Sequence, residues 1–306
     1  MSTTPGFGDK LAARVAERES QLVLGLDPDP AALWPGTAED GNGGADPSER
    51  AATAVLAHCR ALIDAVAPAC VAVKPQLARF EALGVPARAV LGSVVEHARA
   101  AGLLVIADAK RGDIDVTAAA YGAALFGGME TPFGPIAGLG VDMATVNPLM
   151  GRDAIVPFVE AARATGAGVL LLVRTSNPGA ADIEDLELNG GGTVWERLAG
   201  LVDELGAGDV GTSGLSDVGA VLGATVPGHL ARARELMKQA TFLLPGVGTQ
   251  GGRVEDLAPA FAPGRAGGLV TASRSIANAH HDTGENPAQA ARAQAERLRE
   301  AAWALG

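Results

Sequence analysis

The chain has 306 residues and a net charge of −11 at pH 7, and 48% of its residues are hydrophobic. A chain this acidic lacks the clustered Lys and Arg that nucleic acids and anionic membranes attract, so neither is an expected partner. No segment reaches the about 18 uninterrupted apolar residues of a membrane helix, and residues 1–20 have no apolar signal core. Cys59 and Cys70 are too few for a disulfide framework, so both are expected to be packing residues of a cytoplasmic protein.

Short apolar runs recur along the chain with the length and aliphatic composition of buried strands. They occupy residues 21–27, 70–76, 103–109, 143–148, 168–175, 218–225, 241–247 and 268–274. Longer helical patterns follow them, at residues 46–67, 86–101, 114–126, 151–165, 193–205, 228–240, 253–261 and 286–304. The first helix has the clearest start, because Asp46 suits an N-cap, Pro47 the first turn and Glu49 the third position of a capping box.

This alternation predicts the fold class. Strands that each precede a helix predict a parallel sheet closed into a (β/α)8 TIM barrel, and residues 1–306 are expected to form this single domain. A doubly wound open sheet is the alternative, but it usually has a glycine-rich turn after its first strand, and here the first strand ends in LDPDP. Two polar, glycine-rich stretches, near 35–47 and 206–217, are expected to be exposed loop insertions.

Polar side chains stand at the predicted strand ends, where the active face of such a barrel forms. They are Asp27, Lys74, Asp108, Lys110, Asn147, Thr175 and Ser176. Strand ends are often polar in any protein, which is enough to explain Asn147 and Thr175. The general polarity of strand ends does not explain Lys74 and Lys110. Arg strongly outnumbers Lys in this chain, so these lysines are expected where a group that can release a proton is needed, which Arg is not.

The stretch IADAKRGDID, residues 106–115, concentrates these charges. Asp108 and Lys110 are two positions apart and therefore face the same side of a strand, while Asp113 belongs to the following loop or helix start. One interpretation is an ordinary salt bridge with Asp113 as a helix N-cap. The other is an array of alternating charges that holds Lys110 as an oriented ammonium.

Two stretches after the last strands indicate a phosphate site. In barrels, the loops after strands seven and eight commonly bind phosphate through backbone N–H groups and a short helix N-terminus. Here the glycines of GVGTQGG (246–252) let the backbone approach the oxygens, and Arg274 in SRS (273–275) can clamp them. The histidines, expected to be surface or hydrogen-bonded residues on helices or in a late loop, are His58, His97, His229, His280 and His281.

The segment DAKRGDI resembles the DxKxxD signature of the orotidine 5′-phosphate decarboxylase family, in its longer bacterial form. Further matching segments follow in order along nearly the whole chain: LGLDP (24–28), VKPQ (73–76), RTSNPG (174–179), PGVGTQGG (245–252) and SRSI (273–276). The resemblance implies decarboxylation of orotidine 5′-phosphate to uridine 5′-phosphate in pyrimidine biosynthesis, with no cofactor and no metal, by a homodimer.

The resemblance also implies a role for each matching residue. The catalytic set is Lys110, Asp108, Lys74 and Asp113, with Lys110 as the proton donor to C6 of the pyrimidine. The substrate-binding set is Asp27, Thr117, Ser176, Gln250, Gly248, Gly251, Arg274 and Asn147. Asp113 and Thr117 are implied to reach across the homodimer into the neighbouring subunit's site.

Three other interpretations remain. A Schiff-base aldolase or a related sugar-phosphate decarboxylase also binds phosphate in a barrel, but a Schiff-base lysine must lose its proton, which carboxylates beside Lys110 oppose. Sugar-acid relatives use a metal with this motif and would be sensitive to EDTA. A non-catalytic nucleotide-binding or scaffold protein is the third interpretation, against which the Lys–Asp array speaks.

Overall fold

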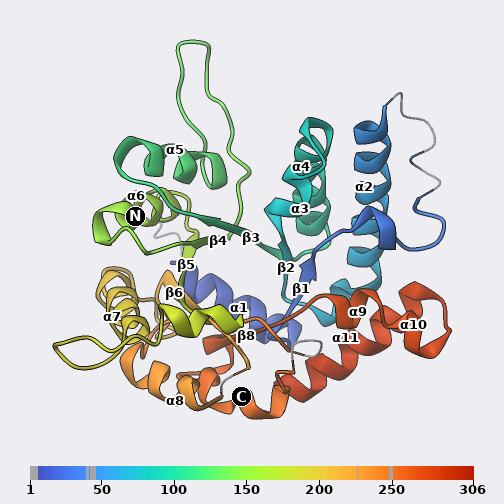
Figure 1. Cartoon of the computed structure of the whole chain (residues 1–306). Helices are drawn as coiled ribbons and strands as arrows, with labels where there is room; N and C mark the ends of the chain where they lie inside the picture. Colours follow the sequence, from blue (N-terminus) through green and yellow to red (C-terminus); the bar gives the residue numbers. More distant parts are fainter. Residues whose placement is uncertain (1–5, 39–40, 42–45, 226, 248–250) are drawn as a thin grey trace.

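The computed structural model describes residues 6–38, 41, 46–225, 227–247 and 251–306, and at its centre eight parallel strands close into a barrel in the order β1 to β8 (Figure 1). The strands are β1 Leu22–Leu26, β2 Ala72–Pro75, β3 Leu104–Arg111, β4 Met143–Val146, β5 Gly168–Arg174, β6 Val218–Leu222, β7 Phe242–Leu244 and β8 Gly268–Ala272. Because β1 pairs with β8 as well as with β2, the predicted (β/α)8 barrel is confirmed and an open doubly wound sheet is wrong.

Helices surround the barrel. Those that follow a strand are α2 Pro47–Val66, α4 Val85–Ala100, α5 Asp115–Leu125, α6 Arg152–Arg163, α7 Val194–Gly206, α8 Pro227–Leu236 and α11 Pro287–Trp303. The shorter helices are α3 Leu77–Glu81, α9 Arg274–Ala277 and α10 His280–Thr283, with 3-10 turns η1 Pro30–Ala32, η3 Ala67–Ala69, η4 Pro178–Asp182 and η6 Arg265–Gly267. After β7 the predicted helix is instead the 3-10 helix η5, Val254–Phe261, which contains Pro259, a residue with no N–H for an α-helical bond.

The amino-terminal helix α1, Phe7–Arg18, covers the end of the barrel where the strands begin. Its Phe7, Leu11 and Val15 are buried in one cluster with the barrel's inward-facing side chains. Those inward side chains include Val23, Ile106, Met143, Leu170, Val221, Leu243 and Leu269. Side chains of the described residues therefore fill the end of the barrel where the strands begin.

The helix α2 starts as predicted, since Asp46 Oδ1 accepts hydrogen bonds from the N–H groups of Ser48 (2.7 Å) and Glu49 (3.2 Å). The segment Pro47–Ala69 is long and apolar enough to cross a membrane, but 56% of its 18-residue apolar window is buried inside the fold. Cys59 and Cys70 are free and fully buried, and burial raises the pKa of each thiol to about 12. Both are packing residues, as predicted.

The two predicted loop insertions lie at opposite ends of the barrel. Residues 206–217 connect α7 to β6 and so lie where strands begin. There the Asp9 carboxylate of α1 accepts the N–H groups of Ser213 (2.7 Å) and Thr212 (3.0 Å), and these bonds, led by that of Ser213, lower the pKa of Asp9 to about 2. Of the stretch 35–47, residues 35–38, 41, 46 and 47 are described and lie between β1 and the start of α2, on the carboxyl side, while residues 39–40 and 42–45 fall outside the described residues.

Candidate active site

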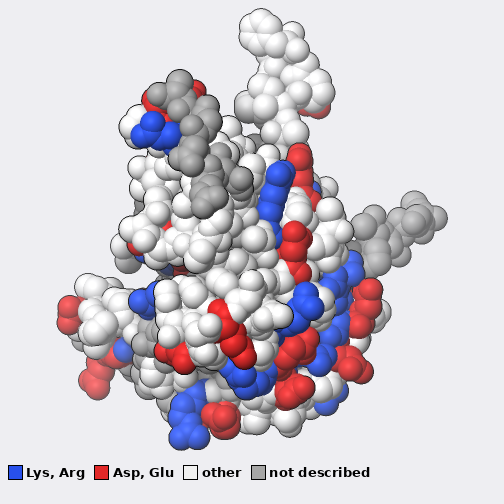
Figure 2. All heavy atoms as spheres, turned by 90° about the vertical axis from the view of Figure 1, so that its right-hand side faces the viewer, with Lys and Arg blue, Asp and Glu red and all other residues white. Residues whose placement is uncertain are grey.

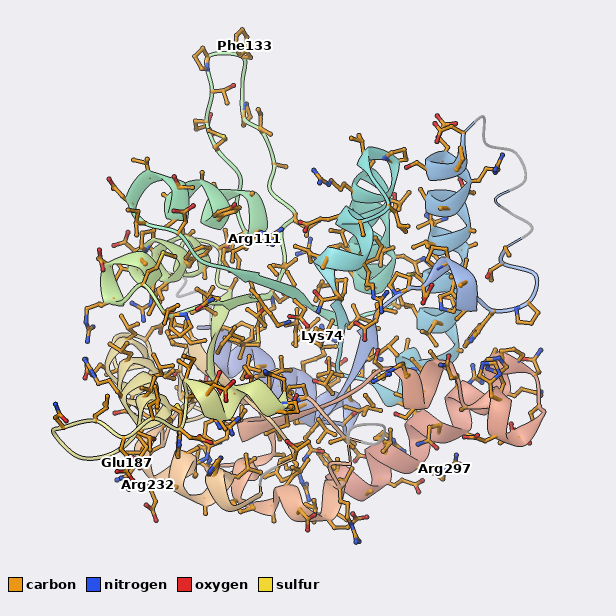
Figure 3. The ribbon with its side chains drawn as sticks, viewed as in Figure 1. Lys74, Arg111, Phe133, Glu187, Arg232 and Arg297 are labelled. Carbon is orange, nitrogen blue, oxygen red and sulfur yellow. The ribbon has the colours of Figure 1, made fainter. Side chains whose placement is uncertain are left out.

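A cavity of about 860 Å³ opens at the carboxyl ends of the strands and is lined by side chains from most of them. It brings together predicted site residues that are far apart in the sequence. Those lining it are Asp27, Lys74, Asp108, Lys110, Ser176 and Arg274. Figure 3 shows Lys74 near the middle of the barrel, where the strand ends converge.

Asp108 sits between two lysine ammonium groups at the floor of this cavity. Its Oδ2 accepts a hydrogen bond from Lys74 Nζ at 2.6 Å, and its Oδ1 accepts one from Lys110 Nζ. Burial is the largest influence on this carboxyl and opposes its ionisation, but the charges and hydrogen bonds of the two lysines outweigh it and lower the pKa of Asp108. Asp108 therefore remains an anion although it is only 6% exposed.

Two polar neighbours absent from the predicted set complete the contacts of Asp108. Gln76 Nε2 donates to Asp108 Oδ2 at 3.0 Å, and Thr145 Oγ1 donates to Asp108 Oδ1 at 3.2 Å. The period of two along a strand could have found both, because Gln76 follows Lys74 by two positions and Thr145 precedes Asn147 by two.

Lys110 lies in an irregular part of β3. The register with β4 shifts between Ala107 and Arg111, and Lys110 has φ of +48°, a conformation that residues other than glycine rarely adopt. The N–H of Lys110 is held by Thr145 Oγ1 at 2.9 Å. The strand is thus not the regular ladder that the sequence suggests, yet the side chains of Asp108 and Lys110 still meet.

The opposite wall joins β1 to β8. Ser273 Oγ bonds both the carboxylate of Asp27 and the carbonyl of Gly25, the latter at 3.0 Å. A Cβ on Gly25 would lie 2.8 Å from the Cβ of Ser273, so only glycine lets the two strand ends approach this closely. The next residue, Arg274, opens α9 and lines the cavity.

The predicted phosphate loop is only partly described. Gly246 lines the cavity and has φ of +105°, so the chain turns here in a way that needs glycine. Gly251 has φ of +89° and does not line the cavity. Gly248 and Gln250 lie outside the described residues.

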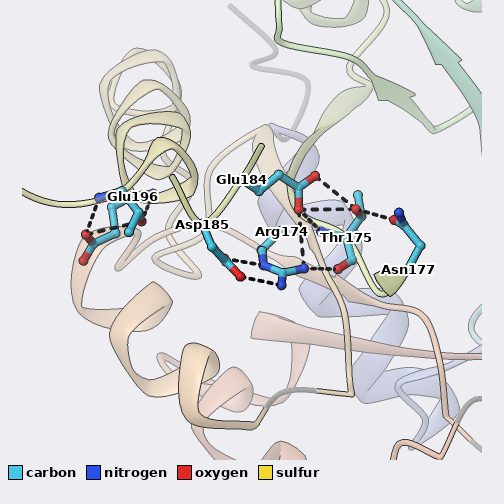
Figure 4. Close-up of polar contacts among 7 residues, drawn as sticks. Arg174, Thr175, Asn177, Glu184, Asp185 and Glu196 are labelled. Atoms are coloured by element: carbon cyan, nitrogen blue, oxygen red, sulfur yellow. Dashed lines mark hydrogen bonds and ion pairs between the residues drawn. The ribbon is translucent and has the colours of Figure 1, made fainter. Parts of the chain in front are cut away.

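The loop after β5 forms a second charged network (Figure 4). Arg174 donates from Nε and Nη2 to the two carboxylate oxygens of Asp185, both at 2.8 Å, and these bonds lower the pKa of Asp185. Glu184 lines the cavity and accepts the N–H of Thr175 at 2.8 Å and its hydroxyl at 3.0 Å. Glu184 is absent from the predicted site, since nothing in a loop sequence reveals that this residue folds back onto Thr175.

Besides Gly251, three predicted site residues in the described part of the chain lie outside the cavity. Asp113 Oδ1 accepts the N–H of Ile114 at 2.8 Å, but Ile114 and not Asp113 occupies the N-cap position of α5, so the N-cap interpretation is wrong. Thr117 is exposed on the first turn of α5. Asn147 Oδ1 accepts the N–H of Leu149 at 3.0 Å, an ordinary turn contact.

The histidines are structural or peripheral. His58 lines the cavity, but its Nδ1 accepts the N–H of Trp34 at 3.1 Å, and burial, with a smaller effect of His280, lowers the pKa of His58 to about 4. His280 and His281 belong to α10, so the prediction that they lie in a loop is wrong. Within the described part of the chain, no three His, Cys, Asp or Glu side chains group as a metal site would require.

Comparisons with known proteins agree on one family. Residues 20–294 match the Orotidine 5'-phosphate decarboxylase / HUMPS family. The proteins named orotidine 5'-phosphate decarboxylase from Rhodopirellula baltica and Deinococcus radiodurans are each 40% identical to this chain, over 278 and 280 residues. These matches cover 90% and 89% of this chain and 89% of each relative.

Solved structures agree as well. The structure of Leishmania donovani OMP decarboxylase matches with a TM-score of 0.72 and 28% identity, over 98% of both chains. A Streptomyces avermitilis structure assigned to the same activity matches with a TM-score of 0.78 and 31% identity, over 99% of this chain and 96% of that one. The resemblance seen in the sequence is therefore confirmed, and this chain is an enzyme of the orotidine 5'-phosphate decarboxylase / HUMPS family.

Proposed function

We propose that this enzyme converts orotidine 5′-phosphate to uridine 5′-phosphate and CO2, without metal or cofactor, as a cytoplasmic step of pyrimidine nucleotide synthesis. The observation that carries the proposal is the Lys74–Asp108–Lys110 array, in which buried Lys74 and Asp108 hold the more exposed Lys110, in a cavity that Arg274 also lines. The family and the names of the curated relatives support the substrate.

Lys110 is the proposed proton donor. When the bond from C6 to the carboxylate breaks, CO2 leaves and the electron pair stays on C6, where an ammonium group stabilises it by fixed charge. The Lys110 ammonium then gives its proton to C6 and regains one from water. An arginine would supply charge but no proton.

Asp108 is proposed to lie against the substrate carboxylate and to orient Lys110. Its contact with Lys110 Nζ supports the orienting role. Placing an anion beside a departing carboxylate would also raise the energy of the bound substrate relative to the transition state. Lys74, on the other oxygen of Asp108, keeps this carboxylate charged.

The remaining residues are proposed to hold the nucleotide. Asp27 and Lys74 contact the ribose and Ser176 the pyrimidine. The phosphate set is Arg274, Gly248, Gly251 and Gln250, with Gln250 also reaching the base, and Asn147 stays a proposed substrate contact. The phosphate lies away from C6, so its binding energy acts by ordering the loops and the charged array.

The enzyme is proposed to be a homodimer in which Asp113 and Thr117 enter the neighbouring subunit's cavity. Both residues lie outside the cavity of their own chain, at or near the exposed start of α5. The segments after β2, β3 and β4, at the same carboxyl end of the barrel, carry exposed apolar side chains, namely Val85, Ile114, Val116, Leu149 and Met150. An exposed apolar face of this kind marks an interface.

The test is to incubate the purified, EDTA-treated enzyme with orotidine 5′-phosphate and follow the loss of orotate absorbance. We expect rapid conversion to uridine 5′-phosphate. Activity that requires an added divalent metal, or borohydride trapping of the substrate on a lysine, would replace the proposal with a metal-dependent or Schiff-base reaction. Tight binding of uridine 5′-phosphate with no turnover would identify a binding protein instead.

A further inference from the structure

Residues 127–140, between α5 and β4, form a projection that we call the arm. Figure 1 shows it extending beyond the other labelled elements, and Figure 3 places Phe133 at its tip. Met129 and Ile136 pair across it through two backbone hydrogen bonds, both of 2.9 Å. Thr131 closes the tip, since its Oγ1 donates to the carbonyl of Gly134 at 2.7 Å. The arm therefore has a defined hairpin shape.

The base of the arm is built against the end of α5. A Cβ on Gly128, which has φ of +98°, would lie 2.1 Å from the carbonyl oxygen of Ile136. A Cβ on Gly138 would lie 2.4 Å from the carbonyl oxygen of Ala123 in α5. Because only glycine fits at both positions, the direction of the arm is fixed by the helix that precedes it.

The outer part of the arm is apolar and faces solvent. Phe133 is 98% exposed, Ile136 58% and Met129 56%. Glu130 is the single charged residue among residues 127–140 of a chain whose net charge is −11, and Figure 2 shows a nearly uncharged projection at the top of the view. Within the described part of the chain, nothing covers Phe133.

The position of the arm indicates what covers it. The arm continues from the last turn of α5, and the first turn at the other end of this helix carries Thr117, one of the residues proposed to serve a neighbouring subunit. The exposed apolar residues Val85, Val116 and Leu149 belong to α4, to α5 and to the loop after β4, which are next to one another in the order of the barrel. Two copies of a chain with charge −11 repel each other at long range. A contact surface almost free of charge lets two such copies meet without placing carboxylates against carboxylates.

We propose that the arm clasps a second copy of this chain, packing Phe133 and Ile136 against the partner and tightening the dimer without touching the substrate. This inference rests on the dimer of the proposed function and extends it. Each subunit gives one arm to the other, as the two-fold symmetry of a homodimer requires. The arm thereby helps to keep Asp113 and Thr117 in the neighbouring cavity.

The first experiment measures the dimer dissociation constant by sedimentation equilibrium for the wild type, Phe133→Asp and Phe133→Ala. We expect the constant to rise by about tenfold or more for Phe133→Asp, and less for Phe133→Ala, as for a buried aromatic anchor. Neither change can disturb the monomer fold, because the side chain is almost fully exposed. Val210→Asp, an exposed apolar residue in the 206–217 loop, is the matched control and should leave the constant unchanged.

Activity measured over a range of protein concentrations separates this inference from the proposed function. Phe133→Asp should lose specific activity on dilution and regain wild-type activity at high concentration. An active wild-type dimer whose dissociation constant is unchanged by Phe133→Asp would overturn the arm inference alone. A wild type that is dimeric but never decarboxylates the substrate would overturn the proposed function, while the dissociation constants would still decide the role of the arm. An active wild-type monomer would overturn both the dimer and the arm.

A second measurement follows the solvent exposure of the tip of the arm. Phe133→Cys introduces an exposed thiol into a chain whose own two cysteines are fully buried. Its labelling rate should be low above the dimer dissociation constant and rise on dilution. A rate that is the same at all concentrations would contradict the inference. A second result would also contradict the inference. It is that the wild type binds phosphatidylcholine vesicles, and that Phe133→Asp abolishes this binding but leaves the dimer dissociation constant unchanged.

Discussion

Lys110 combines an unfavourable backbone conformation with a favourable set of contacts. A residue other than glycine held at positive φ costs about 1–3 kcal/mol, and here Thr145 and Asp108 hold it. Lys110→Arg should retain the charge but lose the proton, and should reduce kcat by at least about 10²-fold, as expected for loss of a positioned proton donor. Binding of uridine 5′-phosphate should stay measurable. Lys238→Ala, an exposed lysine, is the control, and near-wild-type kcat for Lys110→Arg would remove the proton-donor role.

Arg274 tests the phosphate end of the cavity. Arg274→Ala should weaken binding of uridine 5′-phosphate by about 10- to 100-fold, the usual effect of losing a charge-assisted hydrogen bond. Uridine, which has no phosphate, should bind the variant and the wild type equally well in the same calorimetric titration. Equal affinity of both proteins for the phosphorylated ligand would place the phosphate elsewhere.

His58 should make the enzyme less stable in mild acid. Its pKa is lowered from 6.5 to about 4 by burial, so the unfolded chain takes up this proton first as the pH falls. The free energy of unfolding should therefore decrease between about pH 6.5 and pH 4, by about 3 kcal/mol from this residue, and the loss should level off below. Urea unfolding of the wild type and of His58→Asn across this pH range measures the decrease in the free energy of unfolding. If this free energy depends on pH in the same way in both proteins, His58 is not the cause.

At the scale of elements, the loop after β5 folds back and holds the end of that strand in place through hydrogen bonds, and we call this contact the brace. Glu184 reaches back to the backbone and side chain of Thr175, next to Ser176. Glu184→Ala should leave the Thr175 N–H without its partner and weaken binding of uridine 5′-phosphate by about tenfold, with a smaller effect for Glu184→Gln. Glu187→Ala, an exposed residue of the same loop labelled in Figure 3, is the control. If all three variants bind equally well, the brace does not matter for the ligand.

At the scale of the whole molecule, the dimer decides whether a site is complete. Lys110→Ala and Asp113→Ala should each be inactive alone. When the two variants are mixed in equal amounts and exchange subunits, about half of the dimers contain one subunit of each kind. One of the two cavities in each mixed dimer is intact, so the mixture should regain about a quarter of the wild-type activity. Activity assays after exchange measure the recovery. No recovery with proven exchange would mean that Asp113 works within its own chain.

The sequence by itself determined the barrel and the main charged residues. Alternating strand and helix patterns predict the closed parallel sheet because each strand needs a helix to cover its outer face. The scarcity of lysine, together with the spacing of Asp108 and Lys110, singles out the array, since a period of two places them on one side of a strand. The Asp46 cap was also predictable, because it depends only on neighbouring residues.

The tertiary structure decided what depends on contacts between distant segments. Three sets of hydrogen bonds are encoded by no local pattern. Glu184 bonds Thr175, Thr145 bonds Asp108 and Lys110, and Asp9 bonds the 206–217 loop. The strand irregularity at Lys110 and the 3-10 helix after β7 likewise follow from packing and from Pro259 rather than from hydrophobic period. The arm is absent from the sequence-based predictions because its direction is set by the close approach of Gly138 to α5.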